Sequence, residues 1–206
     1  MDLNLLFPGS LVYVPGMLDS PTSSCVLLVE DEKKILVDPG GFPSLEILED
    51  RLTSLGLSPD GITDIFLTHF HLDHAFNSMF FPNAKVHLHE SYSSRDYGSF
   101  GPIVGAMYQK IVLSWNRVEP FRNGDMLLDS VEVLESPFHS RDHVSFFLET
   151  SNCGNVFICG DICTRQIQYH EMRKGMRTDE AAAFVMKYFD MADTVIFSHD
   201  LPIFKR

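Results

Sequence analysis

Residues 69–74 read His-Phe-His-Leu-Asp-His and follow a strongly apolar stretch, Ile-Thr-Asp-Ile-Phe-Leu-Thr at 62–68. The β-branched and aromatic content of residues 62–68 predicts a strand, and a short helix is predicted at 74–79. In the extended loop between them, the first two histidines point to the same side, while the aspartate and the last histidine stand where the chain turns into the helix. This cluster of imidazole and carboxylate groups is typical of a metal site, and it can serve two neighbouring ions.

A single loop supplies too few ligands to complete two metal sites, so further ligands should come from other loops. His139, Asp161 and His199 each follow a predicted strand. Loops at one edge of packed sheets converge on one place, where binding and catalytic residues gather. We therefore expect these three side chains to join the HxHxDH loop in one site.

The apolar pattern along the chain predicts strands in both halves, with helices between and after them. Strands are predicted at 11–14, 24–30, 34–38, 62–68, 84–89, 131–134, 144–150, 156–159 and 194–197, and helices at 44–55, 74–79 and 179–189. This order favours an α+β protein, a four-layer αββα sandwich of two mixed β-sheets. Residues 99–117 allow a helix behind a glycine-containing entry, and we interpret them as a lid or an interface segment.

Length and composition favour one globular domain spanning residues 1–206. Hydrophobic residues make up 45% of the chain and charged ones 21%, which excludes a disordered or collagen-like protein. The net charge is −12, so the chain lacks the broad basic surface that binds the phosphate backbone of nucleic acids. RNA is therefore a disfavoured partner. No apolar run is long enough to cross a membrane and the N-terminus lacks a basic signal region, so we expect a cytoplasmic protein with reduced cysteines.

Four motifs occur in order along the chain: HxHxDH at 69–74, Ser-Pro-Phe-His at 136–139, Gly-Asp at 160–161 and Ser-His at 198–199. With these motifs the chain resembles the metallo-β-lactamase fold superfamily over nearly its whole length. It is similar to the compact single-domain branch, which includes animal metallo-β-lactamase-domain proteins. Phe138 and Ser198 stand where that family usually has glycine, so we expect the pocket to be shaped differently while the ligands are kept.

The resemblance implies a role for each candidate ligand. The first metal is assigned to His69, His71 and His139, the second to Asp73, His74 and His199, and Asp161 bridges both. Asp38 is similar to an early aspartate of the family that supports the metal loop. Imidazole and carboxylate ligands suit two divalent transition-metal ions, with Zn²⁺ favoured and Fe or Mn accepted by the same set.

Two metal ions about 3.5 to 4 Å apart can bridge a water and lower its pKa, so a metal-bound hydroxide is the predicted nucleophile. The chain has no Gly-x-Ser-x-Gly elbow that would offer a serine instead. Asp73 is predicted to take part in catalysis by accepting a hydrogen bond from the hydroxide. His143, four residues after His139, is the predicted catalytic group that must stay protonated.

Substrate binding is assigned to Thr164, Arg165 and Tyr169, which follow Asp161 closely. Related lactonases and thioesterases carry groups that contact the substrate at such positions. The lactonase tyrosine is replaced by Thr164, which weakens a lactonase assignment, and Arg165 can bind an anionic group. The predicted function is metal-dependent hydrolysis of a small ester, thioester, lactone or phosphodiester.

Two alternative functions stay open. One is an endoribonuclease of the same fold, and the other is an oxidoreductase similar to the mononuclear-iron persulfide dioxygenases. Metal analysis separates the second from a dinuclear hydrolase, because the dioxygenase needs a single iron. The expected partner is a small-molecule substrate, with no membrane contact, and a homodimer also stays open.

Overall fold

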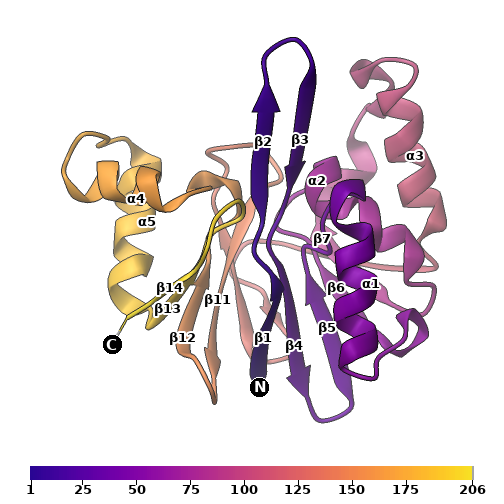
Figure 1. The fold of residues 1–206 in the computed structure, drawn as a ribbon, viewed down its shortest axis with the longest axis horizontal. Coiled ribbons are helices and arrows are strands. Elements are labelled where there is room, and N and C mark those ends of the chain that lie inside the picture. The colour runs from indigo at the N-terminus through magenta and orange to yellow at the C-terminus, as the bar shows by residue number, and fades with distance from the viewer. Residues whose placement is uncertain (206) are drawn as a thin grey trace.

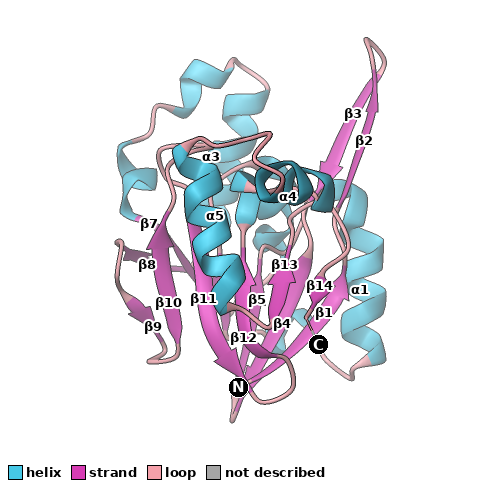
Figure 2. Cartoon of the chain, turned by 90° about the vertical axis from the view of Figure 1, so that its left-hand side faces the viewer, coloured by secondary structure: helices cyan, strands magenta, loops and turns pink. Residues whose placement is uncertain are grey.

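A computed structural model describes residues 1–205 and contains two six-stranded mixed sheets that pack face to face (Figures 1 and 2). The first sheet has the strand order β1-β4-β5-β6-β7-β8, and the second has the order β14-β13-β12-β11-β10-β9. The strands of the first sheet are β1 (Asp2–Phe7), β4 (Cys25–Glu30), β5 (Lys33–Val37), β6 (Asp64–Phe66), β7 (Lys85–His89) and β8 (Arg117–Phe121). Those of the second are β9 (Met126–Leu127), β10 (Val131–Glu135), β11 (Val144–Thr150), β12 (Gly154–Ile158), β13 (Thr194–Ile196) and β14 (Ile203–Phe204).

Helices cover the outer face of each sheet, which confirms the predicted αββα sandwich. Helices α1 (Leu45–Ser54) and α3 (Val104–Ser114) cover the first sheet, and α4 (Gln166–Arg173) and α5 (Glu180–Met191) cover the second (Figure 1). The short α2 (Leu72–Ala75) follows the HxHxDH loop. Single turns of 3₁₀ helix are η1 (Phe42–Ser44), η2 (Pro59–Gly61), η3 (Phe76–Phe80), η4 (Glu90–Ser94), η5 (Tyr97–Phe100) and η6 (Gly160–Ile162).

The core has one apolar layer between the sheets and one beneath each pair of helices. In β4 the alternation of a strand sends Val26 and Leu28 toward the second sheet, while Cys25 and Leu27 pack under α1 and α3. Both faces of this strand are buried, which explains why its sequence is apolar throughout rather than alternating.

The carboxyl ends of parallel strands place the chemically active residues at one edge of the sandwich. Strands β5 and β6 pair in parallel with Val37 opposite Phe66, and β12 and β13 pair in parallel with Ile158 opposite Ile196. Because parallel strands of matched register end together, the loops that follow all four strands emerge at the same level. These loops carry Asp38, the HxHxDH motif, Asp161 and His199.

The structure differs from the sequence prediction in two places that bear on function. The predicted strand 11–14 belongs to neither large sheet, because β2 (Ser10–Val14) pairs only with β3 (Leu18–Thr22) in a separate hairpin. Within 99–117, Tyr108 and Ile111 of α3 are buried in the core of the first sheet, so this helix is a fixed outer layer rather than a free lid. Among residues 1–205, no helix has the length and apolar character needed to span a bilayer.

Candidate metal centre

Three histidines from two loops turn their ring nitrogens toward one another. His69 Nε2 lies 3.0 Å from His71 Nδ1, and His139 Nε2 lies 3.0 Å from the same atom. Neutral imidazoles have one lone pair and one N–H each, so three rings cannot all satisfy one another at these distances. A cation between the three nitrogens gives each of them a partner.

A second group lies beside the first and contains two carboxylates and two imidazoles. His74 Nε2 is 3.1 Å from Asp161 Oδ1 and 3.6 Å from Asp73 Oδ2, and His199 Nε2 is 3.4 Å from each of these two oxygens. His74 Nε2 and Asp161 Oδ1 are buried and make no hydrogen bond. Buried polar atoms without partners are costly, so this arrangement also fits a bound cation.

Asp161 joins the two groups. Its Oδ1 faces His74 and His199, while its Oδ2 lies 3.4 Å from His139 Nε2 and 4.0 Å from His69 Nε2. Glycine is needed just before it: Gly160 has a φ of +60°, and a Cβ there would lie 2.4 Å from His143 Nε2. The seven residues therefore form one continuous cluster with a carboxylate at its centre.

The protonation of the cluster also suits metal binding. Burial lowers the pKa of His69 well below its usual value and that of His71 to about 4, so both rings are neutral, as metal binding requires. Burial also acts to lower the pKa of His74, but the carboxylates of Asp161, Asp38 and Asp73 outweigh it and raise this pKa well above 6.5. The second group thus carries excess negative charge, which a divalent cation can neutralise in place of the proton on His74.

Hydrogen bonds at Nδ1, the ring nitrogen that faces away from the other candidate ligands, orient His74 and His199. The carboxylate of Asp38 accepts hydrogen bonds from Thr68, through its N–H at 2.8 Å and its hydroxyl at 2.7 Å, and lies 2.9 Å from His74 Nδ1. Asp38 adopts a φ of +48°, an uncommon backbone conformation that is tolerated by aspartate. His199 Nδ1 donates to the carbonyl of Thr22 at 2.9 Å. Because Nδ1 carries the proton in both rings, Nε2 is left free to bind a metal.

A second support holds the HxHxDH loop from the side of the His139 loop. Asp142 Oδ2 accepts a hydrogen bond from the backbone N–H of Phe70 at 3.1 Å, between the first two histidines of the motif. Arg95 Nη1 lies 3.1 Å from the same oxygen and its guanidinium lies over the ring of Phe100. Sequence reasoning missed this network, since only the tertiary fold brings residue 95 to residue 142.

His143 lies in the centre but contradicts its predicted role as a protonated catalytic group. Its Nε2 accepts a hydrogen bond from the backbone N–H of Asp161 at 2.8 Å, and its Nδ1 lies 2.8 Å from Ser136 Oγ. Both ring nitrogens therefore have protein partners, with the proton on Nδ1. Burial lowers its pKa to about 3, so the ring is neutral at all physiological pH values. His143 positions the bridging carboxylate instead of moving a proton.

The three predicted substrate residues lie in different environments and do not form one group. Thr164 lies just before α4, where its N–H and hydroxyl donate to Gln168 Oε1 at 2.7 and 2.9 Å, while its carbonyl accepts from His199 N–H. Arg165 is exposed at the start of α4. Tyr169 contradicts its assignment: its ring is buried and stacks on Phe189 at 3.7 Å, inside the layer between α4 and α5.

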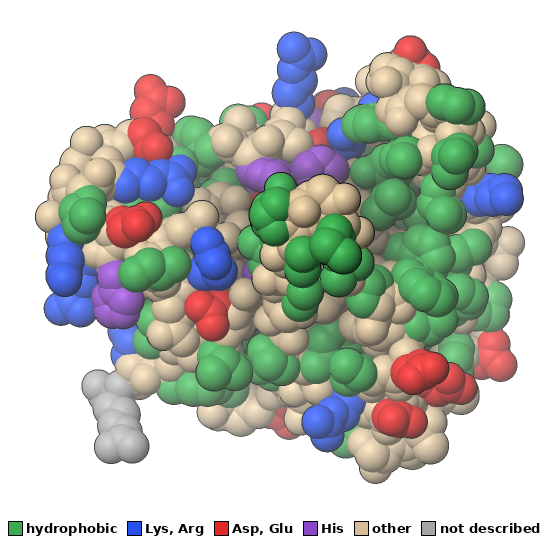
Figure 3. Space-filling view, turned by 45° about the horizontal axis from the view of Figure 1, so that its top comes forward, with side chains coloured by type: hydrophobic (Ala, Val, Ile, Leu, Met, Phe, Trp, Pro, Cys, Tyr) green, Lys and Arg blue, Asp and Glu red, His purple; other side chains and the backbone are tan. Residues whose placement is uncertain are grey.

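An apolar cavity of about 530 Å³ opens beside the second group of ligands. Asp73 lies in its wall together with Leu72, Phe76, Phe42 and Met107. Figure 3 shows histidine side chains reaching the surface beside the projecting hairpin, with a broad hydrophobic surface next to them. Sequence analysis had no signal for this cavity, because its walls come from four separate segments.

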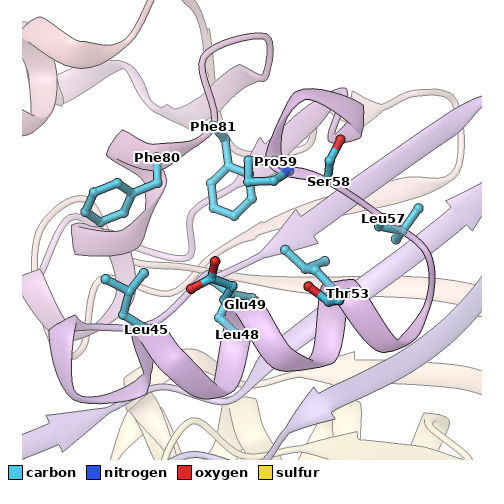
Figure 4. A pocket seen from close by; sticks show the side chains of 10 residues that line it. Leu45, Leu48, Glu49, Thr53, Leu57, Ser58, Pro59, Phe80 and Phe81 are labelled. Atoms are coloured by element: carbon cyan, nitrogen blue, oxygen red, sulfur yellow. The ribbon is translucent and has the colours of Figure 1, made fainter.

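Another apolar cavity, of about 410 Å³, lies between α1 and the segment around Phe80 and Phe81 (Figure 4). Leu45 and Leu48 of α1 face the two phenylalanines across it, and Glu49 is its acidic wall residue. None of the seven candidate ligands lines this cavity. A substitution in this cavity can therefore serve as a control for one in the cavity beside Asp73.

An αββα fold with histidines and aspartates gathered at its strand ends defines a class of metal-dependent hydrolases. The family model of the metallo-beta-lactamase superfamily matches residues 19–180, so the chain belongs to that superfamily and is one of its hydrolases. A curated relative, metallo-beta-lactamase domain-containing protein 1 from Xenopus laevis, is 24% identical over 97% of this chain and 80% of its own length. An N-acyl homoserine lactonase from Bacillus thuringiensis is 28% identical over 76% of this chain and 67% of its own length.

Solved structures show the same fold. A crystal structure described as a metallo-beta-lactamase from Thermotoga maritima superposes with a TM-score of 0.93 at 38% identity, covering 98% of each chain. The dizinc quorum-quenching lactonase AidC superposes with a TM-score of 0.66 at 20% identity, covering 92% of this chain and 77% of its own. The family resemblance inferred from the motifs is thereby confirmed.

Proposed function

We propose that the protein is a dinuclear metal-dependent hydrolase that cleaves a small ester, thioester or lactone with an apolar acyl group. The bridging position of Asp161 carries the dinuclear assignment, because its two oxygens face two separate sets of ligands. His69, His71 and His139 would hold one ion, and Asp73, His74 and His199 the other, with Asp161 shared. The neutral imidazoles and hard carboxylates of this set favour Zn²⁺.

Two ions held by these residues would supply the Lewis acidity that activates a water and polarises the scissile carbonyl. The side chains of the protein accept the proton and hold the candidate ligands in position. The Asp73 side chain is 16% exposed and lies in the cavity wall, so its carboxylate can accept a proton from the attacking water. His143 and Asp38 hold Asp161 and His74 in place, so that the ligands need no rearrangement during the reaction.

The cavity beside Asp73 supports a substrate with an apolar acyl group. Phe42 and Phe76 lie in its wall, and apolar walls bind hydrocarbon through the hydrophobic effect. Solved relatives of the lactonase group have been described with N-hexanoyl and N-decanoyl homoserine products at the active site. The net charge of −12 disfavours a phosphodiester backbone as the natural substrate.

A substrate panel tests this proposal. Metal-loaded and chelator-treated protein should be assayed with aryl esters of increasing acyl length, a thioester, a lactone and a phosphodiester, with labelled single-stranded RNA in parallel. We expect metal-dependent turnover of acyl substrates that increases with chain length. Two bound ions per chain and loss of turnover in Asp161→Ala are also expected. Metal-dependent RNA cleavage without acyl turnover, or a single iron with oxygen uptake, would overturn the proposal.

The acyl assignment has a matched control in the second cavity. Phe42 is 69% exposed in the wall next to Asp73, and Phe80 is 42% exposed in the cavity of Figure 4. Phe42→Ala should lower kcat/KM for long acyl chains by about tenfold, with metal content and short-chain turnover unchanged. Phe80→Ala should change none of these quantities. Equal effects of the two substitutions would contradict the placement of the acyl group.

A further inference from the structure

Hairpin β2–β3 projects beyond the two large sheets: the base of β3 packs on the body, where Pro21 lines the cavity beside Asp73, and the remainder is exposed. It rises from the sandwich as a two-stranded sheet of its own (Figures 1 and 2). Its apolar side chains are exposed on both faces, with fractions from 41% to 85% at Leu11, Val12, Tyr13, Val14, Met17 and Leu18. No charged residue occurs between Asp2 and Asp19. An isolated apolar hairpin is marginally stable in water, so these surfaces call for a partner.

The hydrogen-bond pattern of the hairpin shows which backbone groups are free. Leu11 lies opposite Pro21, and proline has no N–H, so this pair makes no reciprocal ladder bonds. Because bonded and non-bonded pairs alternate in antiparallel strands, the ladder bonds belong to Ser10↔Thr22, Val12↔Ser20 and Val14↔Leu18. The N–H and C=O groups of Leu11 and Tyr13 therefore point outward along the free edge of β2.

The two edges of the hairpin differ in their protection against pairing. The outward positions of β3 are Pro21, which offers no donor, and Asp19, which is charged. Proline and charge are the devices by which proteins protect exposed strand edges. The outward positions of β2 are Leu11 and Tyr13, which have neither device. The edge of β2 is therefore the one open to another strand.

We propose that β2 pairs with β2 of a second copy of this chain, so that the two hairpins form one four-stranded antiparallel sheet. A two-fold axis between Val12 and the partner's Val12 places Leu11 opposite the partner's Tyr13. Each copy then directs its free N–H and C=O groups at those of the other. The strand is self-complementary in this register, as a two-fold interface requires.

Charge does not oppose a second copy at this edge, because the strand that makes the contact is uncharged. Each copy carries a net charge of −12, so two copies repel each other wherever acidic surfaces meet. Ser10–Val14 contains no charged residue, and the pairing line therefore brings no like charges together. The register also places Val14 beside the partner's Ser10, which brings the tip around Met17, 85% exposed, to the base of the partner's hairpin.

Proline substitutions test which edge makes the contact. Tyr13→Pro removes an outward N–H of β2 without removing a bond of the hairpin, and Asp19→Pro does the same on β3. Sedimentation equilibrium of the full chain should show a mass of twice 23.4 kDa. Tyr13→Pro should raise the dissociation constant at least about tenfold, because the symmetric contact loses two hydrogen bonds, and Asp19→Pro should leave it unchanged. Thermal melting of each variant controls for folding.

Cysteine cross-linking tests the register. On the two-fold axis, Val12 and its symmetry mate form a non-hydrogen-bonded pair with Cα atoms about 4.5 Å apart, which a disulfide can bridge. In a Cys153→Ser background, where the other cysteines are buried, Val12→Cys should give a covalent dimer on mild oxidation. Tyr13→Cys should not, because it faces the partner's Leu11.

Four results would overturn the proposal. One is a monomeric chain up to millimolar concentration, and another is a dimer that Asp19→Pro disrupts and Tyr13→Pro does not. The third is cross-linking in Tyr13→Cys as strong as in Val12→Cys. The last is a monomer that binds neutral phosphatidylcholine vesicles through the hairpin, which would make a lipid surface the occupant.

Discussion

Two buried histidine–aspartate pairs lie close to the first sheet and behave differently. His74 Nδ1 is 2.9 Å from Asp38, and His87 Nε2 is 2.8 Å from Asp64. In each pair the second ring nitrogen of the histidine is buried without a hydrogen-bond partner. The pairs differ in what that nitrogen faces: His74 Nε2 meets the carboxylates of Asp73, in its own loop, and of Asp161, in another loop, whereas the His87 ring packs edge-on against Phe66 in the core.

The difference shows that a buried histidine–aspartate pair does not by itself make a metal site. Burial alone would raise the pKa of Asp64, but hydrogen bonds from His87 and Thr63 and the charge of Lys33 lower it to about 2. The carboxylate of the His87 pair thus has all its partners in β7, the start of β5 and the residue before β6. The His74 pair stands where several strands end, and a cation there gains ligands from loops that are distant in sequence.

Removing each histidine in turn should give the largest effect. His74→Ala should lower the metal content from two ions to one and kcat/KM by about 10³-fold, since one ion's electrostatic stabilisation is worth several kcal/mol. His87→Ala should keep both ions and the activity, while lowering the free energy of unfolding by about 3 kcal/mol, because Asp64 loses its buried partner. Elemental analysis, steady-state kinetics and urea unfolding measure these effects. Equal metal loss in the two variants would contradict the assignment of the metal site to the His74 pair alone.

Acid should destabilise the metal-free centre through His143 at a higher pH than the one at which Asp64 becomes protonated. The pKa of His143 is about 3 in the folded protein and about 6.5 in the unfolded chain, so the unfolded state binds more protons below pH 6.5. The free energy of unfolding should therefore fall by about 2 kcal/mol between pH 7.5 and 5 on account of this residue. Urea unfolding of chelated wild type and His143→Gln should show the difference, because glutamine keeps an acceptor for Asp161 and a donor for Ser136.

Two other buried groups, His74 and Asp64, also make the free energy of unfolding depend on pH. The contribution of His143 is therefore measured by changing that residue alone. His74, with a raised pKa, contributes stability below pH 6.5 that is lost as the pH rises through its folded-state pKa. Asp64, with a pKa of about 2, contributes stability that is lost only as the pH falls from about 4 toward 2. Asp64→Asn should therefore leave the slope between pH 7.5 and 5 unchanged. Parallel curves for wild type and His143→Gln would refute the role given to His143.

A smaller effect is expected from the support behind the HxHxDH loop. Asp142→Ala removes the acceptor for the Phe70 N–H and the partner of Arg95, so the first ion should bind at least about tenfold more weakly. Asp142→Asn keeps an acceptor and should retain most of the affinity. Competition with a chromophoric chelator measures the binding, and Asp179→Ala, in an exposed ion pair with Arg177, is the control. Equal affinities for Asp142→Ala and Asp179→Ala would show that the support is dispensable.

The amino-acid sequence by itself determined the sandwich and the place of the ligands. Strand periodicity locates the strand ends, and the spacing within 69–74 fixes which side chains leave the loop together, since both are local properties of the backbone. His139, Asp161 and His199 follow from the same rule. Their assignment as ligands stays a prediction that the geometry supports, and so does the single domain.

Only the tertiary structure decided the finer roles, because these depend on contacts between residues far apart in the chain. Tyr169 has the spacing of a substrate contact but lies on the buried side of α4, where Phe189 meets it. His143 has the spacing of a proton donor, yet its Nε2 accepts a hydrogen bond from a backbone N–H of another loop. Residues 11–14 have the composition of a sheet strand, but a strand joins a sheet only where a neighbour offers an edge. Here that neighbour is β3 alone, which leaves the edge of β2 free.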